Sequence, residues 1–129
     1  MHKLNPYEDI VSVMQSYFDG LYHADSKILA NVFHPDARYV NTVVGDYMNF
    51  SRLEYLDIID QRTPPASSGE LRNDQILSIV FGGLHMAFVM AEMTMMGRKY
   101  IDFLTLTFDE NSWRIMSKVF TYTLKQEEV

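Results

Sequence analysis

The sequence predicts an α+β fold in which three N-terminal helices pack inside a strongly curved, mainly antiparallel six-stranded sheet. Amphipathic helical patterns occupy the first half of the chain, and four long strand-like runs occupy the second. The clearest run is Lys99 to Tyr122, where two strands flank the turn Asp109-Glu110-Asn111-Ser112. With 129 residues, the chain matches one ordinary domain, 1–129, with one hydrophobic core.

The first helix is expected to begin at Asn5. Asn5 is a favourable N-cap, and Pro6 then stands at the first helical position, where a missing N–H costs nothing. Apolar residues recur at intervals of three and four as far as Leu21, which places them on one stripe of the helix. This stripe predicts that the helix lies on the sheet, with a hinge at His23-Ala24-Asp25 before the next helix.

A shorter helix and a hairpin are expected next. Ser26 is the predicted cap of a helix over Lys27–Phe33, which Pro35 should stop. β-branched and aromatic residues then predict a strand over Ala37–Val44 and a short return strand over Tyr47–Phe50.

A capping box at Ser51–Glu54 predicts a third helix that runs to about Gln61. The following segment, Thr63–Gly69, is rich in proline and serine and is expected to be irregular. It is the one loop long enough to act as a lid or partner contact, although the plain interpretation is a solvated connector.

The second half predicts an antiparallel meander with apolar residues on both faces. Its strands are expected at Gln75–Phe81, Met86–Met96, Lys99–Phe108 and Trp113–Thr123. The third strand carries Phe103 on one face and Leu104 on the other, whereas a sheet with one wet face should alternate more cleanly. The helices can cover one face only, so we expect a homodimer packed through the outer sheet face.

Composition excludes several classes of protein. The chain has no Cys, so disulfides, thiolate metal sites and cysteine nucleophiles are impossible. The net charge of -6 and the scattered Lys and Arg residues argue against a nucleic-acid partner. No run approaches the ~20 apolar residues of a membrane helix, and the N-terminus has no apolar signal region. We therefore expect a cytoplasmic protein that contacts neither membrane nor nucleic acid.

The order of helices, hairpin, third helix and long meander resembles the nuclear transport factor 2-like superfamily, a cystatin-like α+β cone. The segments Phe33–Tyr39, Tyr100–Leu104 and Trp113–Phe120 are most similar to its putative lumazine-binding and SnoaL-like branch. Members include isomerases, dehydratases, cyclases, ligand-binding proteins and transport adaptors. The resemblance therefore implies a pocket inside the cone and leaves the activity open.

Comparison with the steroid isomerase of this superfamily points to candidate site residues. Tyr17 falls at the position of the oxyanion tyrosine, and Asp102 has the facing of the oxyanion acid, offset by two residues. Asn41 occupies the position of the catalytic base, where an amide cannot take a proton from carbon. Tyr39 shares a strand face with Asn41, and we expect this face to look into the cone.

Each candidate also has a structural interpretation. Tyr17 is expected first as a core aromatic with a satisfied hydroxyl, and Asp102 as either a pocket lining or a structural hydrogen-bond partner. Glu92 is expected to pair with Lys118 or Arg114 across the sheet.

Metal and cofactor sites are not expected, because His34-Pro35-Asp36 and His85 lack metal-ligand spacing. His34 and Asp36 are more simply explained as shaping the turn after the second helix.

Three functional hypotheses follow. The leading one is a domain that binds a small apolar or aromatic molecule in the cone through Tyr17, Tyr39, Asn41 and Asp102, with no catalytic residue assigned. The second is an isomerase, dehydratase or cyclase in which Tyr17 and Asp102 stabilise an enolate and His34 or Asp36 moves the proton. The third is a protein-interaction module with a collapsed cone.

Overall fold

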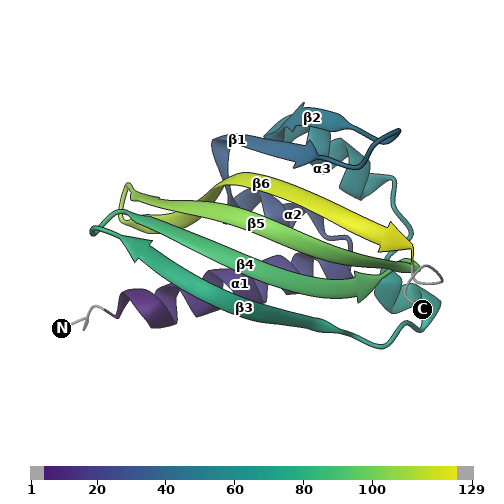
Figure 1. The fold of residues 1–129 in the computed structure, drawn as a ribbon, viewed down its shortest axis with the longest axis horizontal. Coiled ribbons are helices and arrows are strands. Elements are labelled where there is room, and N and C mark those ends of the chain that lie inside the picture. Colours follow the sequence, from purple (N-terminus) through teal and green to yellow (C-terminus); the bar gives the residue numbers. More distant parts are fainter. Residues whose placement is uncertain (1–4, 125–129) are drawn as a thin grey trace.

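A computed structural model describes residues 5–124 of the chain, which form three α-helices and one six-stranded sheet (Figure 1). The helices are α1 (Pro6–Tyr22), α2 (Ser26–Val32) and α3 (Arg52–Asp60), with a short 3-10 helix η1 (Pro65–Ser68). The strands are β1 (Phe33–Asn41), β2 (Met48–Ser51), β3 (Asp74–Gly82), β4 (Met86–Met95), β5 (Arg98–Asp109) and β6 (Ser112–Leu124). Their order in the sheet is β2-β1-β6-β5-β4-β3.

The helices lie on one side of the sheet, which curls over them (Figure 1). β1 pairs with β6 in parallel, and the other neighbouring strands are antiparallel, so the predicted α+β class and mainly antiparallel sheet are confirmed. Within residues 5–124, no helix combines the length and the apolar character needed to span a bilayer.

α1 forms as the sequence predicts. The Asn5 side chain accepts a hydrogen bond from the Glu8 backbone N–H at 3.2 Å, which caps the helix. The inward stripe includes Ile10, Met14 and Tyr17, each fully buried. α1 therefore supplies one wall of the hydrophobic core.

α2 and β1 differ from expectation at their junction. The N-cap of α2 is Asp25 rather than Ser26, because the Asp25 carboxylate accepts from the N–H groups of Lys27 and Ile28. The helix ends at Val32, and Phe33 already belongs to β1, so the expected stop at Pro35 is wrong. The β1–β6 pairing is irregular between Phe33 and Arg38, which lets the strand tolerate a proline.

The hairpin is shorter than the sequence pattern indicates. β1 ends at Asn41 rather than at Val44, and β2 begins at Met48. The Asn41 side-chain oxygen accepts from the Val43 backbone N–H at 3.0 Å, a local turn contact that bends the chain away from the strand.

α3 begins at the predicted capping box. Glu54 N–H donates to the Ser51 hydroxyl at 3.2 Å, and Ser51 N–H donates to the Glu54 carboxylate at 3.0 Å. The segment Thr63–Gly69 was expected to be wholly irregular, but it contains η1, and Pro65 is buried. Burial of Pro65 ties part of this segment to the core.

β6 contains an extra residue that changes which face its side chains occupy. Opposite β5, Leu106 pairs with Ile115 and Thr105 pairs with Ser117, so Met116 is the bulged residue. Ile115 therefore faces the core, and Lys118, three positions later, faces it too.

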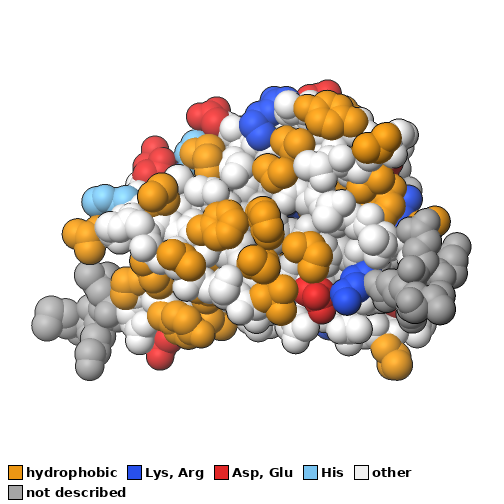
Figure 2. All heavy atoms as spheres, viewed as in Figure 1, with side chains coloured by type: hydrophobic (Ala, Val, Ile, Leu, Met, Phe, Trp, Pro, Cys, Tyr) orange, Lys and Arg blue, Asp and Glu red, His pale blue; other side chains and the backbone are white. Residues whose placement is uncertain are grey.

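The opposite face of the sheet carries exposed apolar side chains. Figure 2 shows hydrophobic groups gathered over the strands on the side away from the helices. Large exposed apolar residues on these strands include Leu77, Val80, Met86, Phe88, Phe103 and Val119. This outer face is an exposed patch of the kind that often marks an interaction surface.

Candidate functional site

Tyr17 and Asp102, both sequence candidates, meet in the middle of the core. The Tyr17 hydroxyl on α1 donates a hydrogen bond to Asp102 Oδ2 on β5. Tyr17 is 0% exposed and Asp102 is 1% exposed. The Tyr17 side chain follows from the apolar stripe of α1, and Asp102 follows from the alternation of β5 between Tyr100 and Leu104, which are also buried. The fold thus places a carboxylate and a phenol inside its apolar interior.

Lys118 completes this polar cluster, and sequence reasoning missed it. Its Nζ lies 4.0 Å from Asp102 Oδ2, too far for a direct hydrogen bond, and the residue is 4% exposed. Four aromatic rings surround the ammonium with centroids 5.0 to 5.3 Å away: Tyr17, Tyr39, Tyr55 and Phe120. The rings and the carboxylate together stabilise a buried cation. Phe120 could have revealed that Lys118 points into the core. The two residues are two positions apart on β6, so alternation places them on the same face of the strand.

Burial dominates the electrostatics of the cluster. Desolvation lowers the pKa of Lys118 from 10.5 to about 8, although the Asp102 carboxylate opposes this shift and Arg62 adds to it. Burial, reinforced by Asp102, raises the pKa of Tyr17 well above its ordinary value. The tyrosine therefore keeps its proton at neutral pH, whereas Lys118 changes charge at mildly alkaline pH.

Tyr39 and Tyr55 form the wall on the side of β1 and α3. Their rings stack at a centroid distance of 4.2 Å. Burial raises the pKa of Tyr39 to about 12 against the opposing effect of Arg62, and burial also raises the pKa of Tyr55. Both phenols are therefore neutral hydrogen-bonding groups across the physiological pH range.

Two buried polar atoms of the cluster have no hydrogen-bond partner among the described residues. They are the Tyr55 hydroxyl and Asp102 Oδ1. A buried polar group left unpaired destabilises the fold by about 1–3 kcal/mol, so such atoms are rare in native cores and often belong to functional sites. The cluster therefore has capacity for further hydrogen bonds.

Asn41 lies on the predicted inner face but does not join this cluster through its amide. Its Nδ2 donates to Asp46 Oδ2 at 2.9 Å, and its oxygen accepts from Val43 N–H. Tyr122 also donates to Asp46, at 2.6 Å. Asn41 is 2% exposed and shapes the β1–β2 turn beside the cluster.

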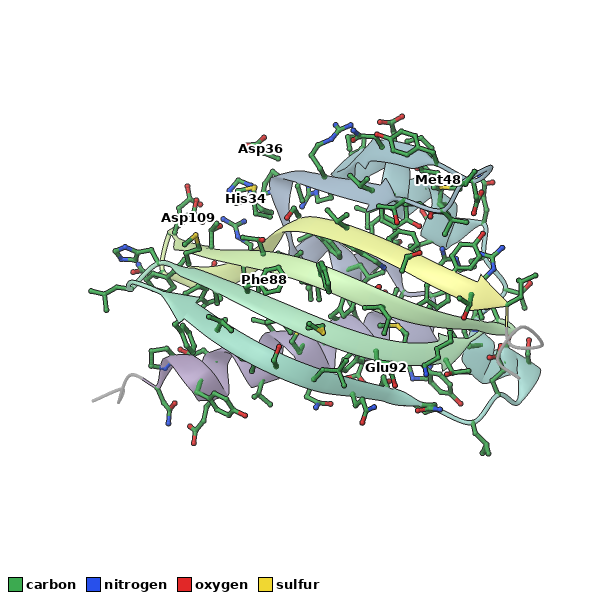
Figure 3. All side chains as sticks on the ribbon, viewed as in Figure 1. His34, Asp36, Met48, Phe88, Glu92 and Asp109 are labelled. Atoms are coloured by element: carbon green, nitrogen blue, oxygen red, sulfur yellow. The ribbon has the colours of Figure 1, made fainter. Side chains whose placement is uncertain are left out.

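The other sequence candidates lie elsewhere. His34 and Asp36 sit near Asp109 at the edge of the molecule (Figure 3), where His34 Nε2 is 3.3 Å from Asp109 Oδ2 and the Asp36 N–H donates to His34 Nδ1. His34 and Asp36 thus shape the chain after α2, as the structural interpretation proposed. Among residues 5–124, no group of three or more His, Asp or Glu side chains is arranged to hold a metal ion.

Glu92 does not pair with Lys118 or Arg114, and that expectation is wrong. It accepts a hydrogen bond from Gln75 at 3.1 Å and lies 4.0 Å from Lys99 Nζ. The strand register places Ile101 rather than Lys118 beside Glu92, and the bulge in β6 turns Lys118 to the opposite face. Glu92 and Phe88, both labelled in Figure 3, lie on β4.

Chemically, the cluster joins one carboxylate, one ammonium and neutral phenols in an apolar enclosure. The Tyr17 proton is directed at Asp102, so these two groups do not form a pair of free donors in this conformation. The arrangement suits recognition of a polar group on an otherwise apolar molecule.

A family model described as "Putative lumazine-binding" matches residues 5–121, which is most of the chain. The chain belongs to this family. The match spans every helix and nearly the whole sheet, including Tyr17, Asp102 and Lys118. No curated protein gives a significant match to the sequence.

Several solved structures have the same fold as this chain. An NTF2-like protein of unknown function from Shewanella baltica OS155 superposes with a TM-score of 0.81 at 23% identity, covering 94% of this chain and 98% of the other. An NTF2-like protein of unknown function from Silicibacter pomeroyi DSS-3 superposes with a TM-score of 0.80 at 24% identity, covering 91% of this chain and 95% of the other. A domain of unknown function with a cystatin-like fold from Nostoc punctiforme PCC 73102 superposes with a TM-score of 0.76 at 14% identity, covering 98% of this chain and 82% of the other. At such identities the likeness shows the nuclear transport factor 2-like fold alone.

Proposed function

We propose that this protein binds a small, largely apolar or aromatic molecule inside its cone. Tyr17, Tyr39 and Asp102 would contact the ligand, Lys118 and Tyr55 would join them, and Asn41 would hold the adjoining wall. The family name, which refers to a small heterocycle, supports a binding role in general terms.

The proposal depends on two buried polar atoms of the cluster that have no hydrogen-bond partner within residues 5–124. Tyr55 and Asp102 each keep a polar atom without a partner among the described residues, at a depth where such atoms destabilise the fold. A ligand that supplied the missing hydrogen bonds would recover that free energy. Because Tyr17, Tyr55 and Asp102 are at most 1% exposed, the site must open before a ligand enters. α3 carries Tyr55, so an outward movement of α3 would open it.

The geometry favours binding over the enzymatic alternative. In an oxyanion site both donors must point at the reacting oxygen, whereas the Tyr17 hydroxyl donates to Asp102. The two suggested proton carriers, His34 and Asp36, contact each other and Asp109 instead.

Native mass spectrometry of the purified protein tests the proposal. We expect a retained small molecule, identifiable after denaturation, that is lost from the double variant Tyr17→Phe/Tyr55→Phe. Tyr47→Phe is the matched control, since Tyr47 is 66% exposed on the β1–β2 turn. A bare chain in every preparation, or a ligand retained equally by the double variant, would contradict binding at this site.

We also propose that the outer sheet face joins two copies in a homodimer. The patch in Figure 2 lies on the side that the helices leave uncovered. Ile101, Phe103 and Val119 line a shallow apolar hollow on it. A second copy would present the same apolar surface, so a two-fold axis through the patch would bury both faces at once. This arrangement leaves the helix side of the sheet uncovered, so α3 can still move outward to admit a ligand. We also propose that the protein acts in the cytoplasm.

A further inference from the structure

The buried cluster contains unsatisfied hydrogen-bonding groups of two opposite kinds. Asp102 Oδ1 is a carboxylate oxygen without a partner among the described residues, and it accepts hydrogen bonds. The Tyr55 hydroxyl, also without a partner there, has a proton to donate. A molecule that satisfies both must therefore bring a donor and an acceptor.

Lys118 is a second hydrogen-bond donor, beside Tyr55, for an acceptor atom on the ligand. Its ammonium is 4.0 Å from Asp102 Oδ2, so this ion pair leaves its N–H groups short of a direct hydrogen bond to that oxygen. The hydroxyl of Tyr17 already donates to the same Oδ2. Asp102 thus has one occupied oxygen and one open oxygen.

Aromatic rings define the shape of the space around these groups. Tyr39 and Tyr55 are stacked at 4.2 Å, and Phe120 tilts against Tyr39 at 5.0 Å. A flat unsaturated ring could replace part of these contacts with stacking contacts of the same kind, so the rings favour a flat ligand over a globular one.

We infer that the ligand presents to this cluster the edge of a flat, unsaturated ring on which a carbonyl oxygen neighbours an N–H or O–H group. The N–H or O–H donates to Asp102 Oδ1, and the carbonyl accepts from Lys118 and Tyr55. This inference rests on the proposed binding function and assigns Lys118, Tyr55 and Asp102 Oδ1 as the groups that read the ligand.

The local charge agrees with this assignment. Lys118 faces Asp102 within the cluster, and the Arg62 guanidinium acts on Lys118, Tyr39 and Tyr55 as a further positive neighbour. Two cations and one carboxylate favour an electron-rich carbonyl oxygen over a cationic ligand.

Isothermal titration calorimetry with four probes tests the inference. 2-Quinolone carries a carbonyl beside an N–H group, and quinoline lacks that carbonyl. N-methyl-2-quinolone lacks the N–H donor, whereas 4-methyl-2-quinolone keeps the donor and carries its methyl group at another position, as a control for size. One hydrogen bond corresponds to about a tenfold change in affinity. We expect 2-quinolone and 4-methyl-2-quinolone to bind roughly tenfold more tightly than the other two probes.

Variants link each preference to a residue. In Asp102→Asn the preference over N-methyl-2-quinolone should shrink, and in Lys118→Met the preference over quinoline should shrink. Tyr47→Phe should keep both, since Tyr47 lies on the exposed turn. Thermal unfolding checks that each variant is folded, and the probe series on the wild-type protein decides the inference if one is not.

The outcomes separate this inference from the proposed function. Equal affinity for all four probes would overturn the donor and acceptor edge while leaving a binding cone intact. Failure of every probe to bind would also overturn the inference, and the molecule retained in native mass spectrometry would still decide the proposed function independently.

Discussion

The Tyr17 hydroxyl donates a hydrogen bond to Asp102 Oδ2 across 85 positions of sequence, and this contact joins the first helix to the centre of the sheet. Because both residues are buried, the contact is shielded from water and from salt. It therefore links the stability of the core to the chemistry of the candidate site.

Replacement of Tyr17 by Phe should destabilise the protein by about 1–3 kcal/mol, because the ring is kept while Asp102 Oδ2 loses its hydrogen bond. Urea unfolding measures the loss. Tyr7→Phe is the control, since Tyr7 is 59% exposed near the start of the same helix, and it should change stability by less than about 0.5 kcal/mol. Equal stabilities of Tyr17→Phe and Tyr7→Phe would show that the buried hydrogen bond contributes nothing.

Replacement of Asp102 by Asn should destabilise the protein by about 1–2 kcal/mol near neutral pH, because the Lys118 ammonium, whose pKa is only about 8 beside the carboxylate, loses its counter-ion and releases its proton in the folded state. The amide oxygen can still accept from Tyr17, so the variant isolates the loss of charge. In the double variant with Lys118→Met, part of the loss should be recovered, with a coupling of about 0.5–3 kcal/mol. Denaturant unfolding of the four proteins gives the cycle, and strict additivity would argue against a functional ion pair.

The titration of Lys118 should make stability rise with pH in the mildly alkaline range. The pKa of Lys118 is about 8 in the folded protein and 10.5 without the fold. Between these values the unfolded chain holds a proton that the folded chain has released, so the free energy of unfolding increases with pH. Below the folded pKa the penalty for the buried charge is fully present. From about pH 7 to about pH 9.5 the gain should be about 2 kcal/mol.

The measurement compares the wild-type protein with Lys118→Met at each pH, so that other titrations cancel. The range stops near pH 9.5 because Tyr17, Tyr39 and Tyr55 have raised pKa values in the folded state, and ionisation of unfolded tyrosines then favours unfolding. A difference between the two proteins that stays constant with pH would place the titration of Lys118 outside this range.

Phe103→Lys should dissociate the proposed homodimer, because Phe103 is 44% exposed within the apolar hollow of the outer face and two added charges would meet across the two-fold axis. Light scattering should show twice the 15.0 kDa chain mass for the wild-type protein and a single chain for the variant. Leu71→Lys is the control, since Leu71 is 91% exposed outside the strands. A single-chain mass for the wild-type protein at micromolar concentration would rule the dimer out.

Sequence by itself determined the features that depend on neighbours along the chain. The Asn5 cap, the Ser51–Glu54 capping box and the Asp109–Ser112 turn all form as expected, because each is stabilised by contacts within a few residues. The alternation of β5 also placed Asp102 on the same face as Leu104. Local rules were weaker at the start of β1, where packing of Phe33 against Tyr55 accompanies a strand in place of the last helical turn.

Only the tertiary structure decided what surrounds Asp102. Alternation counted forward from Trp113 and Ile115 would place Lys118 on the outer face, and only the bulge at Met116 reverses this. Strand register likewise separates Lys118 from Glu92. The contacts of Asp102 with Tyr17 and Lys118 join residues far apart in sequence, and their strength depends on the exclusion of water by the rings of the core. Burial is a property of the whole fold, and burial lowers the pKa of Lys118 and raises that of Tyr17.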